Sequence, residues 1–164
     1  MRRAGAAGGL EAGTGAHPLP ERLQIGLSRP QQHRILTRIR HGRHSVQAVL
    51  EGPNGKPVSV SLILDTGATT IALPASMMAA LGFSDNNLSP GRTRTAGGTV
   101  NARSGRLAAV SIGSARAKDV EIIFIDDRTF GRSSKGLLGM SFLKHFQMTV
   151  SNDPAHIVLV PKRS

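Results

Sequence analysis

Apolar residues recur at every second position in the chain from about residue 44 onward. Val46, Ala48 and Leu50 follow this rule, and Val58, Val60, Leu62 and Leu64 resume it after Gly52-Pro53-Asn54-Gly55. A period of two is typical of half-buried β-strands, and a Gly-Pro-Asn-Gly sequence favours a turn. The pattern therefore predicts a β-hairpin over residues 44–64 that leads directly into Asp65.

Short strands and turns are predicted for most of the remaining chain. Extended segments are expected at residues 70–73, 92–95, 99–103, 107–112, 120–125, 148–150 and 157–160, with a glycine-tipped hairpin over 92–103. A short helix is expected over 74–81, because Pro74 stands near its start and Gly82 at its end. One or two helical turns are expected over 141–146, after a charged loop at 126–135 and the element Gly136-Leu137-Leu138-Gly139.

The N-terminal region has a different character. Residues 1–30 are rich in Gly, Ala and Pro and lack apolar periodicity, which predicts a disordered arm. In residues 31–43, Ile35, Leu36 and Ile39 have rough helical spacing among arginines, which indicates either a short basic amphipathic helix or a solvated linker. The predicted division is therefore a basic arm and linker at 1–43 and a mostly β domain at 44–164.

Composition narrows the classes of function. The 164 residues suit one domain, and the lack of cysteine excludes disulfides, a thiolate nucleophile and Cys-ligated zinc. The formal net charge of +11 raises nucleic acid or an anionic membrane as a partner of the arm. This partner is disfavoured, because eight Arg against two Glu place +6 of that charge in residues 1–44, most of which is predicted to be unfolded.

No apolar run approaches the roughly 18–20 residues needed to span a bilayer. Arg2 and Arg3 are followed by Gly and Ala rather than by the apolar core of a signal peptide. The chain as written is expected to be soluble and cytoplasmic, or periplasmic if an N-terminal anchor precedes it.

Asp65-Thr66-Gly67-Ala68 is the strongest candidate site. An aspartate at the end of an apolar strand, followed by small residues, leaves room for a peptide backbone to approach its carboxylate. The alternative is an ordinary turn, since Asp and Gly are both common in turns. The tripeptide alone does not decide between the two.

The wider order of motifs resembles the retropepsin-like aspartic peptidases, particularly the bacterial single-domain members, over residues 44–162. Leu62-Ile63-Leu64 precedes the Asp65 loop, a glycine-tipped hairpin follows some thirty residues later, and Leu137-Leu138-Gly139 precedes a short helix. The resemblance implies a small closed β-barrel in which Asp65 is catalytic and Thr66, Gly67 and Ala68 support its loop. It also implies that Leu137, Leu138 and Gly139 pack beside the loop, and that Ala96, Gly97, Gly98 and Thr99 form the tip of a flap.

The single Asp-Thr-Gly loop implies a homodimer, because this family needs two such loops and a single-loop chain must obtain the second from another copy. The resemblance then implies an aspartic endopeptidase that binds an extended peptide and activates water between two Asp65 side chains, without a metal or cofactor. Two departures are visible: Thr69 and Thr70 stand where retroviral members carry an acid, and the chain has no Tyr. Apolar pocket walls are expected from Ile63, Ile71, Met77, Leu107 and Leu137.

Other chemistries have weaker support. The six His lack metal-ligand spacing, no Gly-x-Ser-x-Gly turn supports a serine hydrolase, and Gly97-Gly98 lacks the lysine of a phosphate loop. Asp126 and Asp127 are expected to be solvated rather than catalytic. The competing function is a peptide-binding or assembly module that keeps the fold without turnover.

Overall fold

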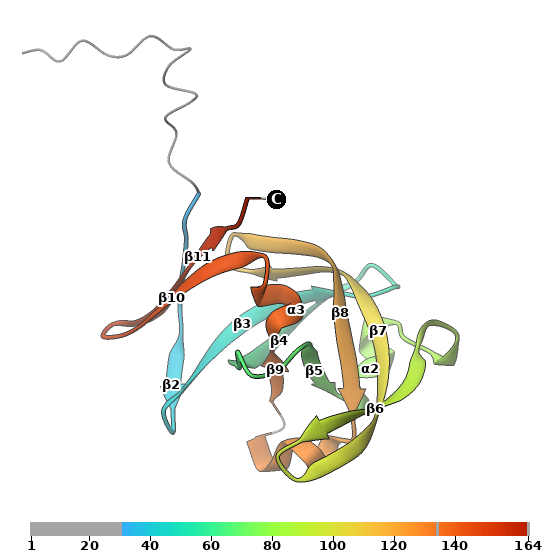
Figure 1. Cartoon of the computed structure of the whole chain (residues 1–164). Coiled ribbons are helices and arrows are strands. Elements are labelled where there is room, and N and C mark those ends of the chain that lie inside the picture. The colour runs from blue at the N-terminus through green and yellow to red at the C-terminus, as the bar shows by residue number, and fades with distance from the viewer. Residues whose placement is uncertain (1–30, 134, 164) are drawn as a thin grey trace, which may run out of the picture.

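The computed structural model describes residues 31–133 and 135–163, and within them strands dominate (Figure 1). The strands are β1 (His33–Leu36), β2 (Arg38–Arg40), β3 (Arg43–Glu51), β4 (Pro57–Leu64), β5 (Ile71–Pro74), β6 (Ser89–Thr95), β7 (Gly98–Ile112), β8 (Ala115–Ile125), β9 (Gly136–Leu138), β10 (Phe146–Asn152) and β11 (Ala155–Pro161). The helices are α2 (Met78–Leu81), α3 (Met140–Leu143) and the 3-10 turns η1 (Ala75–Met77), η2 (Asp85–Asn87) and η3 (Asp127–Ser133).

The larger sheet has the strand order β2-β3-β4-β9-β5-β8-β7-β6. An additional antiparallel pairing joins β3 to β7, with Leu50 opposite Val110. This pairing closes the strands β3, β4, β9, β5, β8 and β7 into a ring, which leaves β2 and β6 as the outer strands. The ring buries alternate side chains of its strands, including Leu50, Leu62, Leu107 and Ile122, in one apolar core.

A second sheet of three strands, in the order β1-β11-β10, lies against this ring (Figure 1). Ile35, Ile157 and Leu159 of this sheet join the main core, together with Phe142 and Phe146 around α3. Within β1, His33 and Ile35 are buried while Arg34 and Leu36 are exposed, which is the period of a strand.

The prediction of a helix or a linker over residues 31–43 is therefore wrong. Residues 33–36 and 38–40 are strands, and the described fold starts ahead of the boundary predicted at residue 44. The physical reason is the pairing of β1 with β11, with His33 opposite Leu159, which local periodicity does not reveal. The arm predicted at residues 1–30 lies outside the described residues.

Most other element predictions are confirmed. The hairpin over 44–64 is β3 and β4, the helix over 74–81 is η1 and α2, and Gly82 ends α2 with a left-handed φ of 84°. Several bounds differ: the segments predicted at 99–103 and 107–112 form one strand, β7, the strand predicted at 120–125 begins at Ala115, and the predicted loop at 126–135 contains η3. β7 stays continuous because it pairs with β8 on both sides of Gly105.

No helix in the described part of the chain is long and apolar enough to cross a membrane.

Candidate active site

Asp65 follows the last residue of β4 and begins the loop that leads to β5. Its backbone N–H donates a hydrogen bond of 3.0 Å to the carbonyl oxygen of Leu138, and its own carbonyl oxygen accepts one from the Ala68 N–H at 3.2 Å. The Gly67 N–H donates to the carboxylate oxygen Oδ1 at 2.9 Å. The Asp65 side chain is 28% exposed. The carboxylate is therefore oriented by backbone groups while part of it stays open to a ligand.

The element Leu137-Leu138-Gly139 lies directly beside this loop, as predicted. β9 runs parallel to β4, with Leu64 opposite Leu138, and the Met140 N–H donates to the Ala68 carbonyl oxygen at 2.8 Å. A Cβ atom on Gly139 would lie 2.7 Å from the Ala68 carbonyl oxygen and would overlap the Thr70 carbonyl oxygen. Glycine is therefore required at position 139 by the close approach of the two backbones.

Ser141 fixes the other end of the loop. Its side chain is buried, its hydroxyl donates to the Glu121 carbonyl oxygen at 2.7 Å, and its oxygen accepts the Ile71 N–H at 3.0 Å. This hydroxyl thus joins α3, β8 and the start of β5. Sequence reasoning missed Ser141, because no local pattern distinguishes a bridging serine from an ordinary helical one.

Arg43 is the charged residue that contacts Asp65. Its Nη2 lies 3.6 Å from the Asp65 Oδ2, with 53% of the Arg43 side chain exposed. Sequence reasoning missed this pair, because it assigned Arg43 to a basic helix or linker. The available signal was His41-Gly42, the kind of two-residue sequence that turns a β-hairpin. Both residues have positive φ values, 51° and 74°, and the turn places Arg43 opposite Arg40.

The predicted flap residues lie at the end of the β6–β7 hairpin. Ala96 and Gly97 form the turn, Gly98 and Thr99 begin β7, and the Thr95 hydroxyl donates to the Gly98 carbonyl oxygen at 2.8 Å. Gly98 has a φ of 118°, a conformation that glycine adopts without strain.

A second apolar cluster lies between this hairpin and β9. Its buried members are Ala72, Ala102 and Ile125, and Val100, Ile123, Phe130 and Leu137 pack against them partly exposed. Leu137 thus stands on a partly exposed apolar surface, and its role as a pocket wall stays a prediction. Ile71 and Leu107 are fully buried in the main core, so the prediction that they line a pocket is wrong.

Residues 46–142 match the family model described as aspartyl protease. The chain belongs to the aspartyl protease family. Its structure is similar to the crystal structure of a retropepsin-like aspartic protease from Rickettsia conorii, with a TM-score of 0.57 and 28% sequence identity. The match covers 80% of this chain and 99% of that one. No curated protein matches the sequence. The fold is thus mostly β and retropepsin-like, as predicted.

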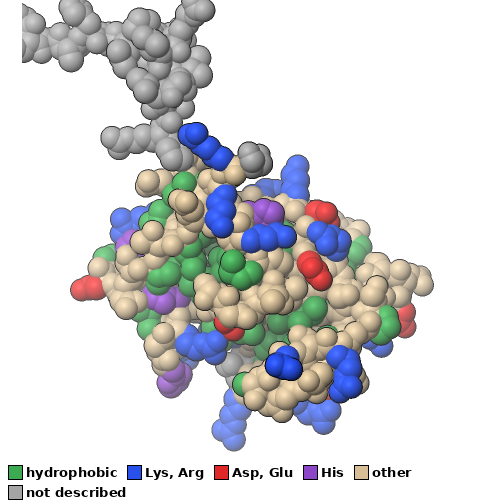
Figure 2. Space-filling view, in the orientation of Figure 1, with side chains coloured by type: hydrophobic (Ala, Val, Ile, Leu, Met, Phe, Trp, Pro, Cys, Tyr) green, Lys and Arg blue, Asp and Glu red, His purple; other side chains and the backbone are tan. Residues whose placement is uncertain are grey.

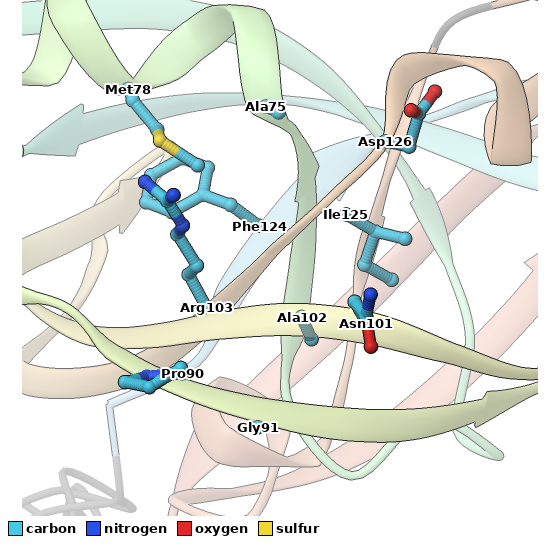
Figure 3. Close-up of a pocket in the computed structure, with 10 residues that line it drawn as sticks. All are labelled: Ala75, Met78, Pro90, Gly91, Asn101, Ala102, Arg103, Phe124, Ile125 and Asp126. Carbon is cyan, nitrogen blue, oxygen red and sulfur yellow. The ribbon is translucent and has the colours of Figure 1, made fainter.

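This aspartyl protease chain also has a pocket of about 730 Å³ at the root of the β6–β7 hairpin (Figure 3). Apolar Met78, Phe124 and Ile125 line it together with Arg103 and Asp126. None of its lining residues comes from the 65–70 loop or from β9. The pocket is therefore separate from the Asp65 carboxylate.

The carboxylates of Asp126 and Asp127 both accept hydrogen bonds from nearby residues. Hydrogen bonds from Arg128 lower the pKa of Asp126 to about 2, and hydrogen bonding with Ser76 lowers the pKa of Asp127. The Asp127 Oδ1 accepts the Ser76 N–H at 3.0 Å. Within residues 31–133 and 135–163, no group of three or more His, Asp or Glu side chains is placed to hold a metal ion.

Proposed function

We propose that this chain is an aspartic endopeptidase, in which the Asp65 carboxylates of two copies form the catalytic pair. The observation that carries the proposal is the partly exposed Asp65 carboxylate, which the Gly67 N–H orients and β9 supports from behind. The family relationship adds weight, and retropepsin-like proteins are typically dimeric. One chain supplies one such carboxylate, so the proposed site belongs to an isologous homodimer.

The reaction follows from two carboxylates in close contact. Two like charges at short range do not ionise together readily, so the pair shares one proton. The ionised member removes a proton from a bound water, which attacks the carbonyl carbon of the peptide bond. The protonated member donates a hydrogen bond to the carbonyl oxygen, and a proton then passes to the leaving nitrogen as the C–N bond breaks.

The surroundings of Asp65 suit an extended peptide. The proposed flap, residues 96–99, projects at the end of the β6–β7 hairpin, and the apolar cluster around Leu137 lies between this hairpin and β9. The flap backbone would add hydrogen bonds to the peptide in the manner of an additional strand. Partly exposed apolar side chains beneath it, such as Val100 and Leu137, would contact the side chains of the substrate.

Substitution of Asp65 by Asn tests the catalytic role. We expect the wild-type protein to cleave an unfolded protein substrate and Asp65→Asn to lose this activity, because the amide cannot act as a base. Asp126→Asn is the matched control, since Asp126 is exposed and pairs with Arg128. Equal cleavage by wild type and Asp65→Asn at acidic and neutral pH would refute the proposal. Peptide binding without cleavage by the wild type would favour the non-catalytic binding module instead.

Mixing the two proteins tests the composite site. If a dimer needs two Asp65 side chains, an equal amount of exchanged Asp65→Asn chains should lower the activity per wild-type chain to about half. An activity that does not change on mixing, together with sedimentation as a monomer at high concentration, would contradict the dimeric site.

A further inference from the structure

The side chain of Arg43 is placed at the mouth of the Asp65 site by the backbone of the β2–β3 hairpin. The turn His41-Gly42 fixes Arg43 at the first position of β3, opposite Arg40. The resulting separation of 3.6 Å between the Arg43 Nη2 and the Asp65 Oδ2 is long for a charge-assisted hydrogen bond. About half of the Arg43 side chain is exposed, so this pair is weak and open to competition by another carboxylate.

The guanidinium of Arg43 has unused donors. Its five N–H groups form no hydrogen bond with any residue in the described part of the chain. A planar guanidinium with free N–H groups binds a carboxylate with two parallel hydrogen bonds. Arg43 therefore has the chemistry of a carboxylate-binding group that the described part of the chain leaves largely unsatisfied.

The elements around the Asp65 loop provide no competing charge. β4, β5, β9 and α3 contain no charged side chain, and residues 66–70 are Thr, Gly and Ala only. On β3, His44 is buried and shares hydrogen bonds with Thr37 and Asn152, while Glu51 pairs with Arg116. The face shown in Figure 2 likewise has Lys and Arg side chains spread over it and few acidic ones.

We infer that Arg43 is a specificity-determining residue, which selects peptides that carry Asp or Glu close to the scissile bond. This inference rests on the proposed function. An extended peptide rises about 3.3 Å per residue, so a guanidinium beside Asp65 reaches side chains about one or two residues from the cleaved bond. In a two-fold symmetric dimer, the second Arg43 provides the same preference on the other side.

The arginines of the β6–β7 hairpin do not explain such a preference. Thr93 lies opposite Val100, which packs in the apolar cluster with Leu137, so Arg92 and Arg94 point to the other face of the hairpin. Arg43 is thus the cation that the described structure places in contact with Asp65.

The test compares matched peptides that carry Glu, Gln or Lys at the positions within two residues of one scissile bond. We expect kcat/KM of the wild type to be about tenfold higher for the Glu peptide than for the Gln peptide, with a smaller ratio at high salt. Arg43→Gln should reduce this ratio to about one, and Arg43→Glu should favour the Lys peptide. Arg34→Gln, at an exposed position of β1, is the control and should keep the wild-type ratio.

A wild-type ratio near one, or an unchanged ratio in Arg43→Gln, would overturn the inference. A loss of cleavage in Arg43→Gln that is equal for all three peptides would also overturn it, since Arg43 would then act on Asp65 rather than on the substrate. Binding of the same peptides to Asp65→Asn, measured by fluorescence anisotropy, reads the preference without catalysis. This separates the two proposals: tighter binding of the Glu peptide supports the role of Arg43 even where wild type and Asp65→Asn cleave equally and the proposed function fails.

Discussion

Substitution of Gly139 by Ala tests how tightly the Asp65 loop depends on β9 and α3. The added methyl group would lie 2.7 Å from the Ala68 carbonyl oxygen and would overlap the Thr70 carbonyl oxygen. Both obstacles are backbone atoms, which cannot rotate away as a flexible side chain does. Overpacking of this kind costs typically 1–3 kcal/mol, and we place Gly139→Ala near the upper end, at about 3 kcal/mol.

That cost corresponds to a decrease in Tm of about 6–12 °C for a chain of this size, measurable by circular dichroism. The hydrogen bond from the Met140 N–H to the Ala68 carbonyl oxygen, 2.8 Å in the wild type, should also open more often. Faster hydrogen exchange at Met140 would report this directly. Peptidase activity should fall further than the loss of folded protein alone explains, because the displaced loop carries the proposed catalytic carboxylate.

Gly91→Ala is the matched control for this experiment. Gly91 lies in β6, a Cβ atom there would meet nothing within 4 Å, and its backbone is not in the left-handed region. The free energy of unfolding of Gly91→Ala should differ from that of the wild type by less than about 1 kcal/mol. A Tm for Gly139→Ala within about 2 °C of the wild type would refute the argument that the two backbones are in contact at this position.

Two further predictions concern groups whose partners are visible in the structure. Ser141→Ala should lower the free energy of unfolding in urea by about 1–3 kcal/mol, because the buried Ile71 N–H loses its acceptor, whereas Ser59→Ala at an exposed position of β4 should have little effect. Asp126 should titrate near pH 2 by carbon-13 NMR, and in Arg128→Gln its pKa should rise toward 3.8, with Arg132→Gln as control. Because the pKa of Asp126 is lowered in the folded chain, ionised Asp126 stabilises the fold above pH 3.8, and this contribution is lost as the pH falls through about 2. An unchanged Asp126 pKa in Arg128→Gln would show that Arg128 does not cause the shift.

The sequence allowed the central part of the fold to be predicted where local patterns and chain neighbours agree. β3 and β4 alternate cleanly and are joined by a short turn, and α2 ends at Gly82, so both follow from nearby residues. The proximity of the Asp65 loop to Leu138 was predicted from the family resemblance rather than from periodicity. Parallel pairing of β4 with β9 joins residues more than seventy positions apart, which no local pattern encodes.

The missed features share a non-local cause. β1 was assigned to a basic helix or a solvated linker because its partner, β11, lies at the other end of the chain. Arg43 was missed with it, since its contact with Asp65 depends on the β2–β3 hairpin. β7 looked interrupted at Gly105, but a Cβ atom there would lie 2.8 Å from the Phe83 ring, so this glycine serves packing rather than a break.

The length of β7 has a mechanical consequence for the hairpin that it shares with β6. Residues from Ala102 to Ile112 pair with β8 and belong to the rigid ring, whereas Gly98 to Asn101 pair with β6 alone. Bending is therefore easiest at the point where the support of β8 ends, opposite Ile125. We expect any bending to move only the hairpin turn and the few paired residues beyond this point. The pocket of Figure 3 lies where the support of β8 ends, since Ala102 and Ile125 are among its walls, so bending there would change its shape.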